Sequence, residues 1–119
     1  MLSGMSAGST EFDATSIRLA VTTVGGRTEA EALATALVER KLAACVNIVG
    51  PIQSVYRWQG DVERAEEFLL LIKTDTARLS PLEHAVHEMH SYDTPEFLVF
   101  EVAGAAEAYA TWLLDSLTR

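Results

Sequence analysis

Hydrophobic and polar residues follow two different periods along the first part of the chain. Between residues 17 and 23, apolar side chains alternate with other side chains, which predicts a β-strand. Two glycines at 25 and 26 end this strand, and apolar residues then recur at helical spacing up to about Leu42. The sequence TEAE at residues 28–31 matches a capping box, so we expect Thr28 to cap this helix.

The middle of the chain is predicted to form one long β-hairpin. Residues 45–58 are extended in pattern, with a bend expected near Gly50-Pro51, and residues 62–73 form the returning arm after a Gln-Gly-Asp turn. The run at residues 68–72 is apolar at every position. A strand with one face in water would alternate, so this run predicts a central strand that is covered on both faces.

The second half of the chain is predicted to form a helix, a strand and a last helix. The sequence SPLE at residues 80–83 predicts a helix start with Ser80 at the cap, and this helix is expected to end near His90. Residues 97–102 then predict a strand and residues 105–117 a last helix. The order βαββαβ plus a C-terminal helix predicts an α+β fold, the ferredoxin-like split βαβ sandwich.

Length and charge narrow the function classes. The 119 residues suffice for one domain, which we place at residues 16–119, and residues 1–15 are predicted to be a disordered tail or leader. Nine Lys and Arg stand against seventeen Asp and Glu, a net charge of −8. So acidic a chain is a poor binder of nucleic acid or anionic membranes. A single cysteine allows no internal disulfide, which favours a reducing cytoplasm.

The three histidines, His84, His87 and His90, lie on the second predicted helix together with Glu83 and Glu88. At about 100° per residue the histidines span about 120° of its surface, away from its apolar face. A His pair at i, i+3 with a nearby carboxylate can hold copper or zinc. Solvated surface histidines explain the pattern equally well, and both interpretations stay open.

Residues 90–96, HSYDTPE, bring an imidazole, a phenol and two carboxylates into one loop between a helix and a strand. Imidazole and carboxylate ligands suit a divalent ion, and loops that a rigid sheet positions often carry binding residues. A hydrogen-bonded turn that locks the start of the next strand is the alternative, with Pro95 restricting Thr94. The spacing does not decide between the two.

Three further positions carry groups capable of chemistry, each with a structural alternative. Cys45 in apolar company is a core residue or a soft-metal ligand, and nucleophilic catalysis there would need a nearby base. Tyr56 and Trp58 before the turn suit hairpin packing or a ligand platform. Lys73 at the end of the apolar strand is an anion contact or a charge that discourages aggregation.

Four sequence motifs occur together in the order and spacing of one known family. They are LAACVNI at residues 42–48, SVYRWQG at 54–60, a Glu pair leading into LLLIKT at 66–74, and HxYDxPE at 90–96. They closely resemble the CutA divalent-cation-tolerance family, and the resemblance covers roughly residues 17–114. This resemblance implies a ferredoxin-like fold assembled as a homotrimer, similar in architecture to the PII signalling proteins. It also implies a cytoplasmic, non-enzymatic protein that binds divalent metal ions, Cu²⁺ foremost.

The resemblance also assigns roles to residues, position by position. Metal ligands are expected at Cys45, His90, Asp93 and Glu96. Clefts between subunits are expected to be lined by Tyr56, Trp58, Glu66, Glu67, Lys73 and Tyr92. An alternative function is a PII-like signalling module that binds an anionic small molecule or a partner protein in those clefts through Lys73.

Two features of this chain modify that expectation. Ser91 stands where the family usually has Pro, which we expect to loosen the loop that presents His90; Thr94 and Phe97 also depart from the usual Val and Ile. Removing Glu11 and Asp13 of the predicted tail leaves −8 − (−2) = −6 on the domain. A trimer would then carry about −18, a field that concentrates cations.

Overall fold

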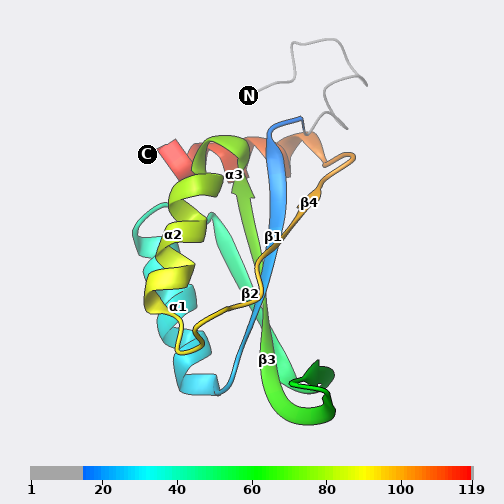
Figure 1. Ribbon diagram of the computed structural model, residues 1–119. Coiled ribbons are helices and arrows are strands. Elements are labelled where there is room, and N and C mark those ends of the chain that lie inside the picture. Colours follow the sequence, from blue (N-terminus) through cyan, green and yellow to red (C-terminus); the bar gives the residue numbers. More distant parts are fainter. Residues whose placement is uncertain (1–14, 119) are drawn as a thin grey trace.

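The computed structural model describes residues 15–118, so the predicted tail at residues 1–15 lies, apart from Thr15, outside the described part (Figure 1). The element order is the predicted one, four strands and two helices in βαββαβ order followed by a last helix. The elements are β1 (Ile17–Val24), α1 (Arg27–Glu39), β2 (Cys45–Trp58), β3 (Asp61–Asp75), a short 3-10 helix (Thr76–Arg78), α2 (Leu79–Met89), β4 (Leu98–Glu101) and α3 (Glu107–Thr118).

All four strands join one antiparallel sheet in the order β2-β3-β1-β4. The β2–β3 hairpin turns at Gln59 and Gly60, and its pairing is interrupted at the predicted bend, where the register shifts between Val49 and Ile52. Gly50 is required there, because a Cβ atom would lie 2.5 Å from the Phe68 ring. The hairpin tip projects beyond β1 and β4 as a two-stranded ribbon (Figure 1).

The main core lies between one face of the sheet and helices α1 and α2 (Figure 1). Side chains alternate across a strand, so Ala20 and Val24 of β1 join Leu70 and Ile72 of β3 on this face. Burying each large aliphatic side chain stabilises the fold by about 1.5–3 kcal/mol. From the helices the core receives Ala30, Leu33, Ala34, Leu37, Leu82, Ala85 and Val86.

Within residues 15–118, the opposite face of the sheet, which we call the open face, is covered only at one end. There Ile17 packs with Ala44 and with α3 residues Ala110, Leu113 and Leu117. Beyond α3, Leu98 and Phe100 of β4 are 52% and 49% exposed. Residues 68–72 were predicted to be covered on both faces of the sheet. On the helix side this cover is complete, but Leu69 and Leu71 point to the open face and are only half-buried within this chain.

The predicted capping box at residues 28–31 is wrong. Helix α1 begins at Arg27 after the extended residue Gly26, and no side chain caps it. The glycine pair allows the chain to leave β1 and enter the helix at once, so Thr28 already lies inside the first turn.

The predicted start of the second helix at Ser80 is also one turn late. The Asp75 carboxylate accepts a hydrogen bond from the Arg78 backbone N–H at 3.2 Å and starts a 3-10 turn at Thr76. This turn continues directly into α2 at Leu79, so Ser80 lies within the helix. The actual cap precedes the predicted one because it belongs to the end of β3.

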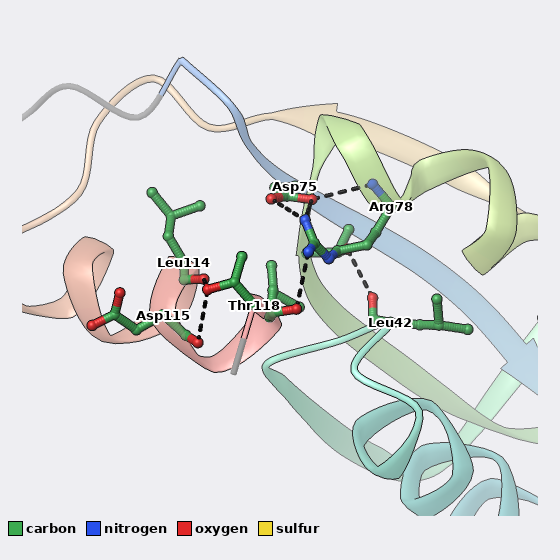
Figure 2. A network of polar contacts seen from close by, with 8 residues as sticks. Leu42, Asp75, Arg78, Leu114, Asp115 and Thr118 are labelled. Atoms are coloured by element: carbon green, nitrogen blue, oxygen red, sulfur yellow. Dashed lines mark hydrogen bonds and ion pairs between the residues drawn. The ribbon is translucent and has the colours of Figure 1, made fainter.

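Arg78 connects three elements at this end of the molecule (Figure 2). Its guanidinium contacts Asp75, with Nη1 2.9 Å from Oδ2, and Nη2 donates to the Leu117 backbone oxygen of α3 at 3.0 Å. Nearby, the Thr74 hydroxyl donates to the Leu42 carbonyl oxygen at 2.8 Å (Figure 2). The partly buried Arg78 thereby holds α3 against the end of β3.

We expect Arg78→Ala to lower the free energy of unfolding by about 1–3 kcal/mol, because it leaves the Asp75 carboxylate and a helix-end carbonyl without their charged partner. Arg78→Lys keeps the charge but lacks the planar fork, so its loss is expected to be intermediate. Urea unfolding at one protein concentration measures both. Arg40→Ala, at an exposed position after α1, is the control, and an equal loss in that variant would contradict the role of Arg78.

Candidate functional site

The loop between α2 and β4, residues 90–97, crosses the end of β1 and brings several acidic and aromatic groups together. The Tyr92 hydroxyl donates a hydrogen bond to Oε2 of Glu67, a buried carboxylate of β3, at 2.9 Å. Gly25, just after β1, makes room for this contact, because a Cβ atom there would lie 3.3 Å from the Tyr92 oxygen. We call Glu67, Tyr92 and Glu96 the acidic loop site.

His90 holds this loop to the sheet. Its side chain is fully buried, and Nε2 lies 2.7 Å from the Thr23 carbonyl oxygen. The Tyr92 backbone N–H donates to Nδ1 at 3.1 Å. Nδ1 is therefore the acceptor, and Nε2 must carry the proton that is donated to Thr23. Both ring nitrogens are engaged in a neutral imidazole, so neither offers a lone pair to a metal ion in this arrangement.

Ser91 tightens the loop, contrary to the expected loosening. Its backbone N–H and its hydroxyl each donate to the Glu29 carboxylate at 3.0 Å. A proline at this position would have neither donor. Glu29 also lies 3.8 Å from the His90 ring. The Ser91–Glu29 pair therefore ties the loop to the first turn of α1.

Negative charge dominates the electrostatics of the acidic loop site. Desolvation, then the hydrogen bond to Glu67 and its charge, raise the pKa of Tyr92 to about 12, so its phenol stays protonated at neutral pH. Partial loss of solvent around the Glu96 carboxyl group, and then the charge of Glu67, raise the pKa of Glu96 above its ordinary value. Each added negative charge is thus disfavoured here, whereas a cation would be favoured.

Cys45 and Lys73 lie together on the open face, away from this loop. The Lys73 ammonium contacts the Asn47 side-chain oxygen and lies 3.5 Å from the Cys45 sulfur. In the register of the sheet, Lys73 pairs with Leu19, which precedes Thr23 by four residues, about 13 Å along the strand. Cys45 is therefore not part of the same cluster as His90.

The other predicted cleft residues lie on the hairpin. Tyr56, Trp58 and Glu66 are exposed on its two arms, and Tyr56 makes the last of the electrostatic contributions that raise the pKa of Tyr92. Asp93 is exposed in the loop itself. Within residues 15–118, no three His, Cys, Asp or Glu side chains are grouped as a metal ion would require.

Sequence reasoning missed two parts of this site. From the sequence, Glu29 was considered only as a member of a capping box, because its hydrogen-bond partner Ser91 is 62 residues away. Gly25 was considered only as the end of a strand, whereas the structure shows that its lack of a side chain makes room for the Tyr92 hydroxyl. No local pattern indicates either contact, since both depend on how the loop crosses β1.

A comparison with family models identifies the protein class. The model of the CutA1 divalent ion tolerance protein family matches residues 18–116, from β1 to α3. The chain belongs to this family. The match includes every element that positions the acidic loop site.

Individual CutA proteins agree with this result. Protein CutA, chloroplastic, of Arabidopsis thaliana is 45% identical over 79% of this chain, and the chain spans about half (52%) of that relative's length. Divalent-cation tolerance protein CutA of Thermus thermophilus is 43% identical over 79% of this chain and 91% of its own. The solved structure of CutA from Synechococcus elongatus PCC7942 matches with a TM-score of 0.85 at 43% identity, over 88% of this chain and 93% of that one.

These neighbours confirm the predicted α+β, ferredoxin-like fold with its four-stranded antiparallel sheet. No helix within residues 15–118 is long and apolar enough to cross a membrane.

The Tyr92–Glu67 contact of this CutA chain is testable by titration. We expect one of the three tyrosines to ionise near pH 12, and Glu67→Gln to lower that value by removing the neighbouring charge. Because the folded pKa lies above the ordinary value, the associated stability is present below about pH 10 and is lost as the pH rises towards 12.

Tyrosine absorbance as a function of pH measures the ionisation, and Tyr92→Phe should remove the high step. Glu63→Gln, an exposed change of the same charge on β3, is the control. Equal titration curves for wild type and Glu67→Gln would refute the contact.

Proposed function

We propose that this CutA1-family chain is a non-enzymatic protein that binds divalent cations, Cu²⁺ foremost, and works as a homotrimer. The observation that carries the proposal is the acidic loop site. There partial desolvation, and after it the buried carboxylate Glu67, raise the pKa of both Glu96 and Tyr92. A divalent cation at this place would compete with a proton for the Glu96 carboxylate and offset the charge of Glu67.

The geometry suggests which residues would contact the ion. Glu67 and Glu96 supply carboxylate oxygens, and Asp93 stands exposed in the same loop. Tyr92 orients Glu67 through its hydroxyl group. The resemblance implies that His90 is a metal ligand. Because both of its ring nitrogens make hydrogen bonds within the protein, we propose instead that His90 positions the loop. For one set of ligands Cu²⁺ generally binds more tightly than the other divalent first-row ions, which supports Cu²⁺ as the foremost cargo.

Cys45 has a different place in this proposal. Its sulfur lies beside the Lys73 ammonium on the open face, so it would serve as a ligand only for an ion bound there or between subunits. Lys73 is already in contact with Asn47 and Cys45. The alternative, a PII-like module that holds an anionic ligand through Lys73, therefore has less support.

The trimer is supported by the open face and by the hairpin. On the open face Leu98 and Phe100 of β4, and Val49 of β2 across the sheet, are about half exposed, and exposed apolar surface of this kind is typical of protein–protein interfaces. A two-stranded ribbon is only marginally stable by itself, yet the hairpin tip extends beyond the sheet with Trp58 59% exposed. Three copies arranged around an axis would cover both features and bring hairpin residues of one copy to the loop of another.

The compartment also remains a proposal. A free thiol at Cys45 is compatible with a reducing cytoplasm. Membership of the family does not determine the compartment, since the Arabidopsis relative is named chloroplastic.

We expect Cu²⁺ affinity to rise with pH through the raised pKa of Glu96, because the proton and the cation compete for one carboxylate. Glu96→Gln should lower the affinity at neutral pH by about tenfold or more and flatten this pH dependence. Calorimetric titrations with Cu²⁺ between pH 5 and 7 measure both effects. Glu63→Gln is the matched charge control, and affinity in Glu96→Gln equal to that of wild type would rule out the site.

For the assembly, we expect light scattering to give about 39 kDa, three times the 13.0 kDa of one chain. Phe100→Glu should shift the mass towards one subunit, because it buries a charge in the proposed interface. Val38→Glu is the control, since Val38 is similarly exposed but lies on α1, on the other side of the molecule. A wild-type mass of 13 kDa at micromolar concentration would contradict the trimer.

A further inference from the structure

Helix α2 presents a row of metal-binding side chains that the acidic loop site does not use. Leu82, Ala85 and Val86 are buried in the core and fix the rotation of the helix. The polar side therefore faces solvent, and it carries Glu83, His84, His87 and Glu88, all of them exposed. Helix α2 itself lies beside α1 in the outer layer of the molecule (Figure 1).

Within this row, one imidazole and one carboxylate already lie together. His84 Nε2 is 3.5 Å from Glu88 Oε2, at the i, i+4 spacing that places side chains on one face of a helix. A metal ion with N and O ligands at about 2.1 Å and an angle near 90° holds these two atoms about 3.0 Å apart. Closing the remaining gap of about 0.5 Å requires only side-chain rotation, since the two side chains are 77% and 65% exposed.

We propose that His84 and Glu88 form a surface site for a divalent transition-metal ion, Cu²⁺ best, with water completing the coordination. The neutral imidazole supplies a nitrogen ligand and the carboxylate an oxygen ligand, a set for which Cu²⁺ is preferred over Zn²⁺. Glu83 and His87 flank the pair and add negative charge and a second imidazole to the row. Because no three donors within residues 15–118 are grouped as a metal site, this one binds through two protein ligands and is weak.

This site is independent of the acidic loop site and of the trimer. The row lies on α2, which covers the face of the sheet opposite the open face, so the proposed assembly leaves it accessible. The competing explanation is a surface ion pair between Glu88 and a protonated His84. Such a pair needs no metal ion, whereas in the proposed site the imidazole nitrogen and the carboxylate oxygen both bind the ion.

The test uses the full chain at pH 7.5 and Cu²⁺ alone as the probe. Proton NMR follows the ring signals of the three histidines, assigned by single His→Gln variants, since paramagnetic Cu²⁺ broadens the signals of nearby rings. We expect His84 to broaden at a Cu²⁺ concentration at least threefold below that needed for His87, and buried His90 to change last. Glu88→Gln should raise the concentration needed for His84 at least threefold.

Two variants separate this site from other effects of charge and from the acidic loop site. Glu39→Gln removes the same charge at an exposed position of α1, and Glu96→Gln removes a carboxylate of the acidic loop site. We expect both variants to leave the His84 response unchanged. Equal broadening of His84 and His87, or an unchanged response in Glu88→Gln, would overturn the proposal. A His84 response that Glu96→Gln abolishes would do so as well, by assigning the ion to the loop instead.

Discussion

The antiparallel pairing of β1 with β3 is the contact on which the rest of the structure depends. Because side chains alternate across these two central strands, the pairing separates a face that α1 and α2 cover from the open face. It also determines where β1 ends, at Val24 opposite Phe68. The next residues, Gly25 and Glu67, are thereby placed side by side under the loop that carries Tyr92.

The polar groups of the loop between α2 and β4 have two different roles. His90 and Ser91 hold the loop in place, because His90 makes a hydrogen bond to Thr23 and Ser91 donates two to Glu29. Glu67 and Glu96 are not neutralised by these contacts, and desolvation and then the charge of Glu67 raise the pKa of Glu96. In a chain with a net charge of −8, this combination is suited to a cation and disfavours an anion.

Local patterns in the sequence were sound guides to the elements but weaker guides to their ends. The period of two in β1 and the helical spacing of α1 each predicted the right element. The capping motifs at Thr28 and Ser80 failed, because Gly26 and Asp75 start the helices from the ends of the preceding strands. Likewise, Ser91 was expected to loosen the loop, since the sequence shows the missing proline ring but not the carboxylate of Glu29.

The sequence by itself determined the order of elements, the bend at Gly50 and the family, because periodicity, turn residues and motif spacing are local properties of the chain. Only the tertiary structure decided which chemical groups meet. In the fold, Cys45 lies away from His90, both ring nitrogens of His90 make hydrogen bonds, and Glu67 contacts Tyr92. The physical reason is that these contacts join residues up to 67 positions apart, and sheet register and loop path, which no local pattern encodes, set their distances.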